Sequence, residues 1–197
     1  MKKSDIIIAA IIGFINGVVF YLMFTFGGLN IYYLWILPII FPFLAAFAMI
    51  IVSLISKVFP PILQLAKFFL VGTLNTFVDL GILNILMWIF GIYSGIFYSV
   101  FKGFSFLAAT TNSYFWNKHW TFQKKEDVFE TKEFIKFLIV TTIGFLINVS
   151  VASFVVNIVG VKFGISPKLW ASIGAIIAAF LAFIWNFSAS KFIVFKK

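Results

Sequence analysis

The sequence of 197 residues has no cysteine, no arginine and a single histidine, His119. Without cysteine there is no disulfide, thiol nucleophile or Cys-ligated metal site, and one histidine cannot build a multi-histidine metal centre. The sequence also shows no nucleotide-binding loop, no motif of paired catalytic carboxylates, no metal-ligand spacing and no nucleophile motif. We therefore expect a protein that is not an enzyme on its own and that carries no cofactor.

Charge is scarce as well. Only 11% of the residues are charged and 63% are hydrophobic, and the mean hydropathy is +1.13. A soluble domain is about half apolar and a quarter charged, so the bilayer is the expected solvent. The apolar runs are about 20 residues long and show no alternation, which favours helices over barrel strands. We predict an all-α membrane protein, a polytopic bundle of about six transmembrane helices.

The apolar segments cover about residues 6–26, 32–55, 68–90, 97–116, 137–159 and 169–190. Pro38 and Pro42 lie in the second segment and predict a kink there. The stretch SKVFPPILQLAK, before the third segment, is expected to be a connector. Residues 126–136 are expected to form a short amphipathic helix on the membrane surface.

Fifteen lysines give the chain a net charge of +9. With the N-terminus inside, twelve of them fall on the cytoplasmic side, Lys162 and Lys168 fall outside, and Lys102 lies within the fourth segment. This bias predicts a multi-pass protein of the cytoplasmic membrane with both termini cytoplasmic. Lysines at helix ends are typical of headgroup contacts, so membrane lipids and not nucleic acid are the expected partners.

An internal repeat fills the last two-thirds of the chain. KFFLVGTLNTFVD from residue 67 aligns with KFLIVTTIGFLIN from residue 136, and SYFWNKHWTF from residue 113 aligns with NFSASKFIVF from residue 186. We predict two tandem hairpins, 67–122 and 136–195, in a four-helix domain of residues 67–197 that follows an extra N-terminal hairpin of residues 1–60. The alternative is that membrane hairpins look alike and carry lysine at both ends for topology alone.

Asp79 is the one acid inside an apolar run, where a charge costs about 2.5–3.5 kcal/mol. Its position is near the middle of the third segment, and its counterpart in the second hairpin is neutral. Polar side chains on its own face and on the other segments predict a polar path: Asn75, Thr76, Asp79, Lys102, Asn112, Asn148 and Asn186. Hydrogen bonding between helices, including an Asp79–Lys102 ion pair, is the simpler alternative.

Asn117, Lys118 and Lys191 lie at the predicted inner ends of the two hairpins. Lysine can hold phosphate as a point charge, although plain anchoring in the interface explains these residues equally well. A stripe of small residues in the last segment indicates close helix packing, either within the chain or in a homodimer: Ala175, Ala178, Ala179, Ala182 and Asn186.

FFLVGTLNTFVDLGILNIL, NSYFWNKHWTF and their weaker second copies resemble the GtrA-like family of small membrane proteins, over about residues 67–197. The second copy departs from the NKHWTF pattern at its end. The resemblance implies a four-helix membrane domain with a role in cell-surface polysaccharide synthesis. The implied activity is the flipping of a polyprenyl-phosphate-linked sugar from the inner to the outer leaflet. Because similar domains are fused to glycosyltransferases, a separate glycosyltransferase is the implied partner.

For this activity the polar path would bind the sugar, and Lys118 and Lys191 would receive the phosphodiester. Two other functions are compatible with the sequence. One is a non-transporting anchor or scaffold subunit of a polyprenyl-phosphate glycosyltransferase. The other is a small proton-coupled multidrug exporter in which Asp79 carries the proton.

Overall fold

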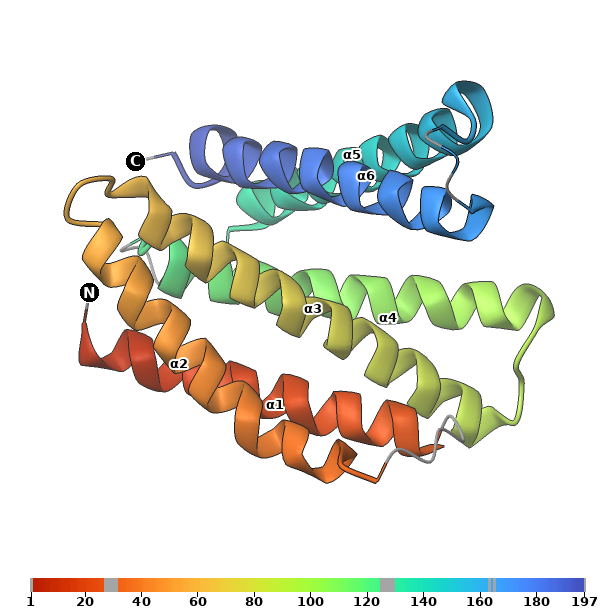
Figure 1. The fold of residues 1–197 in the computed structure, drawn as a ribbon, viewed down its shortest axis with the longest axis horizontal. Coiled ribbons are helices and arrows are strands. Elements are labelled where there is room, and N and C mark those ends of the chain that lie inside the picture. Colours follow the sequence, from red (N-terminus) through yellow and green to blue (C-terminus); the bar gives the residue numbers. More distant parts are fainter. Residues whose placement is uncertain (1, 27–31, 125–129, 163, 165, 197) are drawn as a thin grey trace. The chain divides into compact units, whose positions relative to one another are not determined.

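A computed structural model describes the whole chain except residues 1, 27–31, 125–129, 163, 165 and 197. Over the described residues the fold has six α-helices and no strand, so the predicted all-α class is confirmed (Figure 1). The helices are α1 (Lys3–Phe26), α2 (Leu37–Ile55), α3 (Pro61–Phe90), α4 (Gly95–Trp116), α5 (Thr131–Ser153) and α6 (Pro167–Ala189). A 3-10 turn, η1 (Leu34–Ile36), precedes α2, and π-helical turns extend α4, α5 and α6: η2 (Asn117–Thr121), η3 (Phe154–Val159) and η4 (Ser190–Val194).

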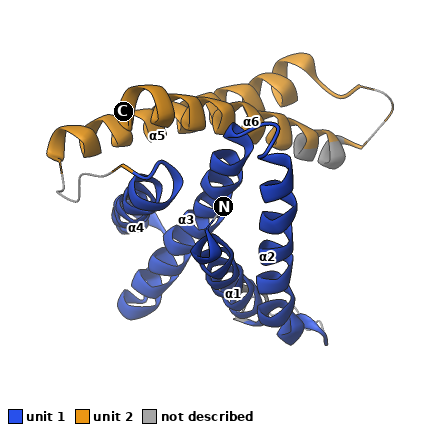
Figure 2. Ribbon diagram, turned by 90° about the vertical axis from the view of Figure 1, so that its left-hand side faces the viewer, with its two compact units in different colours: residues 1–123 blue, residues 124–197 orange. Residues whose placement is uncertain are grey.

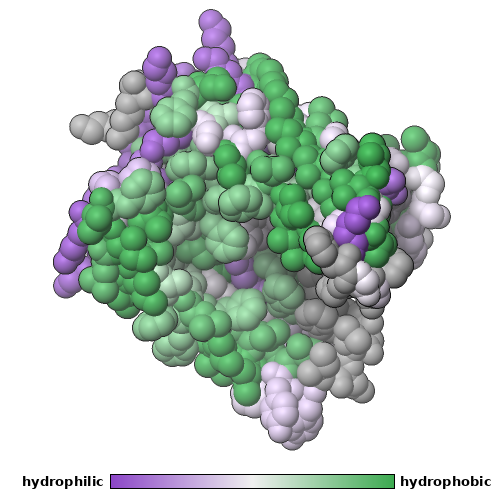
Figure 3. All heavy atoms as spheres, turned by 45° about the horizontal axis from the view of Figure 1, so that its top comes forward, coloured by the Kyte–Doolittle hydropathy of each residue, from purple (hydrophilic) through white to green (hydrophobic). Residues whose placement is uncertain are grey.

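Five of the described helical segments are long and apolar enough to cross a membrane: Lys3–Leu22, Leu34–Ile55, Pro61–Phe90, Thr131–Val159 and Ile173–Val194. The fourth predicted span, α4, has 22 residues but is more polar, because it carries Lys102 and the run TTNS at 110–113. Hydrophobic residues dominate the face shown in Figure 3, as helices in contact with lipid require. The chain is a multi-pass membrane protein.

The chain divides into two compact units, Met1–Gln123 and Lys124–Lys197 (Figure 2). The first unit holds α1 to α4 with η2, so the N-terminal hairpin and the first predicted repeat form one body. The second unit holds α5 and α6 with their π-helical turns. The boundaries predicted for the domains and the repeats stay a prediction.

In the first unit, α1 lies very close to α2. A Cβ atom added to Gly13 would lie 2.5 Å from the carbonyl oxygen of Phe41, and one added to Gly17 would lie 2.5 Å from that of Leu37. Two glycines four residues apart lie on one face of a helix and let two membrane helices approach closely. This contact therefore fixes the N-terminal hairpin through backbone atoms.

Another face of α1 packs on α3. Phe20 meets Phe77 edge to face, with ring centroids 5.0 Å apart. Nearer the start of both helices, a fully buried cluster joins α1, α3 and η2, and it consists of Ile12, Val71, Leu74 and Trp120. The start of α1, the start of α3 and the end of α4 thus lie at the same end of the first unit (Figure 1).

Helix α3 begins earlier than predicted. It starts at Pro61 and not near residue 68, so only Ser56 to Pro60 connect α2 to α3. Proline fits the first helical position, because the N–H that it lacks would have had no helical partner there. For the same reason Pro38, in the first turn of α2, needs no compensation, and Pro42 alone lies inside that helix.

The short amphipathic helix predicted over residues 126–136 is wrong for its described part. Residues 131–136 are the first turns of α5 and continue directly into the fifth span, while 125–129 lie outside the described residues. Glu133 is buried and forms an ion pair with Lys124. An acid in the first turn of a helix is favoured by the helix dipole.

In the second unit, α5 and α6 pack through small residues. A Cβ atom on Gly144 would lie 2.6 Å from Cγ of Asn186, and one on Gly174 would lie 3.1 Å from Cγ2 of Val156. Gly174 and Asn186 begin and end a row of residues at four-residue intervals along α6, and both ends of this row contact α5 or its π-helical extension η3. The face that carries this row is therefore the one that contacts α5.

The small-residue stripe of α6 divides between two sides of the helix. Ala178 and Ala182 are buried and lie on the line from Gly174 to Asn186, so they face α5 within the chain. Ala175 and Ala179 are exposed. Packing inside the chain therefore uses part of the stripe, and the homodimer stays a prediction.

The two predicted repeats share an aromatic contact and a turn. Phe68 packs against Phe122 with ring centroids 6.1 Å apart, and the aligned pair Phe137–Phe195 is 5.7 Å apart. Both η2 and η4 are five-residue π-helical turns. After each turn, the N–H of the next residue, Phe122 or Phe195, donates to the carbonyl of the first residue of the turn, at 2.9 and 2.8 Å.

Candidate functional site

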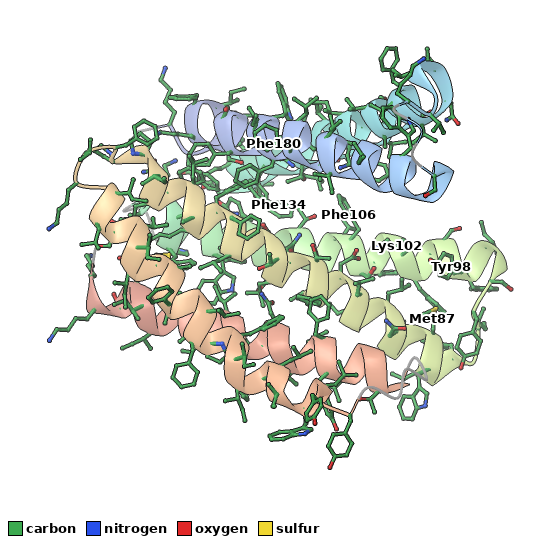
Figure 4. The ribbon with its side chains drawn as sticks, in the orientation of Figure 1. Met87, Tyr98, Lys102, Phe106, Phe134 and Phe180 are labelled. Carbon is green, nitrogen blue, oxygen red and sulfur yellow. The ribbon has the colours of Figure 1, made fainter. Side chains whose placement is uncertain are left out.

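An ion pair joins α3 to α4 in the first unit. Lys102 donates from Nζ to Oδ2 of Asp79, and the hydroxyl of Ser105 donates to Oδ1 of the same carboxylate at 2.6 Å. Ser105 lies one helical turn beyond Lys102, so both side chains reach Asp79 from one face of α4. We call these three residues the mid-helix cluster; Figure 4 labels Lys102 on α4. The pairing left open by the sequence is therefore formed.

The mid-helix cluster lies well inside the helices but is partly open. Lys102 is seven residues from the start of α4, about 10 Å along the axis, and Asp79 is eleven residues from the end of α3, about 16 Å. The exposed fraction of the side chain is 42% for Lys102 and 21% for Asp79. A charged group at this depth is unfavourable against lipid, so its open side requires a polar neighbour.

Two amides flank the mid-helix cluster without partners of their own. Asn75 is one turn from Asp79 on α3, and Asn112 is two turns from Ser105 on α4. The Oδ1 atom of Asn75 and the Nδ2 atom of Asn112 are buried and have no hydrogen-bond partner in the described part of the chain. A buried polar atom left unpaired costs about 1–3 kcal/mol. One free acceptor and one free donor are suited to hydroxyl groups, which can both donate and accept.

The other predicted path residues lie differently. Thr76 is exposed and donates to the carbonyl of Gly72 in its own helix at 3.1 Å. Asn148 and Asn186 belong to the second unit, on α5 and α6. Asn186 lies against the backbone of Gly144, one turn before Asn148, and its Oδ1 atom is buried without a partner among the described residues. At the position of Asp79 the second hairpin thus has a neutral amide and not an acid.

The residues predicted to hold phosphate differ between the two π-helical turns. Lys118 is 1% exposed and donates to the hydroxyl of Tyr114 at 3.3 Å. Asn117 is also buried and donates to the carbonyl of Ser113 at 2.9 Å. Lys191 is half-buried, with Nζ 5.7 Å from the ring centroid of Phe187. Lys191 is therefore the accessible lysine, whereas Lys118 lies inside the protein.

A third ion pair in the described part of the chain is nearly fully buried, and the sequence does not predict it. Lys67 donates to Oδ1 of Asp5 at 2.6 Å, the indole N–H of Trp120 donates to the same oxygen at 3.0 Å, and the backbone N–H of Lys2 donates to Oδ2 at 2.9 Å. Asp5, Lys67 and Trp120 are all nearly fully buried. We call these three residues the inner-end triad. It connects α1, α3 and η2.

The sequence hides the inner-end triad because its members look like ordinary interface residues. Asp5 lies among lysines at the N-terminus, and Lys67 fits the lysine bias that marks the cytoplasmic side. The one available clue is that an acid starts the first span and a lysine starts the third, which puts both at the same membrane surface in the predicted topology. Lys67 and Asp5 are 62 residues apart, so local patterns do not reveal their contact.

Comparison with known families decides the identity. A family model described as GtrA/DPMS, transmembrane domain, matches residues 67–195. The chain belongs to this family. The match covers α3 to α6 with the mid-helix cluster and both π-helical turns, and it excludes the hairpin that supplies Asp5. No curated protein and no solved structure matches the chain. As a member of the GtrA family, it is a membrane protein of a family involved in processes with lipid-linked sugars.

Proposed function

We propose that this GtrA-family protein translocates a polyprenyl-phosphate-linked sugar across the cytoplasmic membrane, for cell-surface polysaccharide synthesis or glycosylation. The observation that carries the proposal is the partly open mid-helix cluster with its two unpartnered amides. A sugar that crosses the apolar core needs hydrogen-bonding groups along its route. The polyprenyl tail needs only the apolar flank that membrane helices provide.

The charges of the mid-helix cluster fit a phosphate-bearing cargo. A lone carboxylate in a low-dielectric core would repel the phosphodiester. Because Lys102 neutralises Asp79, the cluster presents no net charge. The Asp79 oxygens and the free amide atoms of Asn75 and Asn112 then serve as hydrogen-bond partners for sugar hydroxyls.

The phosphodiester is received at the inner ends of the hairpins. Lys191, half-buried between aromatic rings, is the first contact, and Lys118 with Asn117 forms the equivalent site in η2. Asn148 and Asn186 supply neutral polar groups in the second hairpin. Both termini and these turns lie on the cytoplasmic side, as the lysine bias indicates.

The protein works with a separate glycosyltransferase that makes its lipid-linked substrate. The sequence supports this division because it carries no catalytic motif. The translocator itself is not an enzyme. The exposed Ala175 and Ala179 of α6 offer a surface where a second copy can approach closely.

The test measures the sidedness of a labelled polyprenyl-phosphate sugar in proteoliposomes. The wild-type protein should move the lipid between leaflets, and Asp79→Asn should slow the initial rate by roughly tenfold or more, the effect of losing a charged hydrogen-bond partner. Asn84→Leu is the matched control, because Asn84 is a polar residue of α3 that bonds only within its own helix, to Leu80.

A double variant separates transport from scaffolding. An ion pair that only holds helices together can be replaced by apolar residues with little loss. Asp79→Leu with Lys102→Leu should therefore keep the function of a scaffold and abolish that of a translocator. Absence of lipid movement by the wild type, or full activity of the double variant, would reject the proposal. Proton-dependent efflux of organic cations without sugar movement would identify an exporter instead.

A further inference from the structure

The π-helical turn η2 continues α4 and keeps most of its side chains inside the protein. Its N–H to carbonyl bond between Phe122 and Asn117 is 2.9 Å long. Such turns are rare and often mark functional positions in helices. Four of its five residues are buried: Asn117, Lys118, Trp120 and Thr121. The question is what holds a lysine inside a turn at the end of a helix.

Trp120 fixes the turn from two sides. Its ring packs in the apolar cluster with Ile12 of α1 and Val71 of α3. Its indole N–H donates to Oδ1 of Asp5, and Lys67 Nζ lies 5.4 Å from the ring centroid while bonding the same oxygen. Tryptophan needs such a partner when its body is buried in an apolar site. Asp5 is therefore the polar end of the Trp120 binding site.

The second hairpin provides a comparison inside the same protein. Turn η4 has the same length and the same closing hydrogen bond, but within the described residues no acid bonds to it. Ile193, aligned with Trp120, is 53% exposed, whereas Trp120 is 5% exposed. Lys191 is half-buried, whereas Lys118 is fully buried. The π-helical turn thus forms without an acid, and its burial accompanies Asp5.

We propose that Asp5 is a positioning residue for η2: it fixes Trp120 and thereby keeps the ammonium group of Lys118 buried. The N-terminal hairpin lies outside the family match. In this proposal it positions the π-helical turn of the first repeat, so it does more than anchor the chain in the membrane. One consequence rests on the proposed function. Lys118 can meet a lipid phosphate only after Trp120 and the turn have moved, so the contact with Asp5 controls access to this lysine.

Cysteine labelling tests the proposal in the full-length protein, because the chain has no cysteine of its own. Lys118→Cys then carries the only thiol, and its rate of reaction with a water-soluble methanethiosulfonate is measured in detergent. Lys191→Cys is the matched control in η4. In the otherwise native chain, the thiol at 118 should react slowly and the thiol at 191 quickly.

Asp5→Ala should raise the rate at position 118 by roughly tenfold or more, since the Lys67 ammonium and the Trp120 N–H lose their buried acceptor. Asp5→Asn keeps an amide oxygen for the Trp120 N–H but no counter-charge for Lys67, and it should raise the rate as well. The rate at position 191 should not change. Trp120→Phe tests the same contact with less risk of unfolding, because it keeps an aromatic ring and the Asp5–Lys67 pair and removes only the indole N–H that bonds Asp5. It should also raise the rate at position 118.

Unchanged protection of position 118 in Asp5→Asn and in Trp120→Phe, with position 191 unaffected, would overturn the proposal. If Asp5→Ala also alters position 191, its fold has been lost and the other two variants decide. Labelling does not depend on transport. A rise at position 118 in a protein that fails to move the labelled lipid would leave the positioning role in place and reject only the proposed function.

Discussion

Removal of either member of the Asp5–Lys67 pair should strongly destabilise the protein. The exposed fraction of the side chain is 2% for Lys67 and 4% for Asp5, so neither charge can be solvated when its partner is lost. Breaking such a pair costs about 3–5 kcal/mol. Asp5→Ala leaves three donors without an acceptor: the Lys67 ammonium, the Trp120 indole and the Lys2 backbone N–H. Lys67→Met leaves the Asp5 carboxylate buried without its counter-charge, with only the Trp120 indole and the Lys2 backbone N–H as donors.

The double variant Asp5→Leu with Lys67→Met should be milder than either single change. It buries no charge, and its largest remaining defect is the unpaired Trp120 N–H, worth about 1–3 kcal/mol. The two single effects sum to about 6–10 kcal/mol, so the coupling energy between the two positions is at least about 3 kcal/mol. Adding Trp120→Phe should recover part of what the double variant still lacks.

These effects are measured as Tm values in detergent: the protein is heated to a series of temperatures, and size-exclusion chromatography then measures the fraction that stays folded. For a chain of this length each kcal/mol shifts Tm by about 2–4 °C. Each single variant should therefore lower Tm by about 6 °C or more, and the double variant should lower it less. Single variants within about 2 °C of the wild type, or a double variant equal to the sum of the singles, would refute the burial argument.

Two further predictions concern the glycines. Gly144→Ala should lower Tm, because the new Cβ meets the amide of Asn186, and an added Asn186→Ala should restore Tm. Gly72→Ala is the control and should not lower Tm, because nothing lies within 4 Å of its new Cβ. Gly13→Ala should be more damaging than Gly144→Ala, since its neighbour is the Phe41 carbonyl, which cannot rotate away, and α1 and α2 must separate. Gly103→Ala is the matched control, with no atom within 4 Å of the new Cβ, and an equal Tm for the two variants would contradict the close packing of α1 on α2.

The spans could be predicted from the sequence because length and hydropathy alone set them. Segment 6–26 ends where α1 ends, and 32–55 ends where α2 ends. The start of α3 was misplaced because a double proline can end one helix or begin the next, and the sequence contains no sign of which occurs. The polarity of α4 follows from residues visible in the sequence, but its close pairing with α3 is what makes that polarity tolerable.

The candidate site was predictable in its members and not in its contacts. Only Gly91 to Ser94 join α3 to α4, so these helices had to be neighbours, and helical spacing put Asp79 and Lys102 each on the polar face of its own helix. Whether Lys102 would point toward Asp79 or outward depends on side-chain packing, which spacing does not define. The inner-end triad needs α1 to lie on α3, a tertiary contact that hydropathy leaves open because every apolar helix face looks alike.

Lys67 and Lys136 show how the N-terminal hairpin changes the meaning of a repeated residue. They occupy aligned positions and begin spans on the same side in the predicted topology, yet Lys67 is 1% exposed and Lys136 is exposed. Lysine is almost never fully buried unless it is paired, and an opposite charge is the strongest pairing group. Asp5 supplies that charge from outside the family match, so the difference follows from α1 and not from the repeat itself. The first hairpin can therefore bury Lys67, whereas the aligned Lys136 stays at the surface.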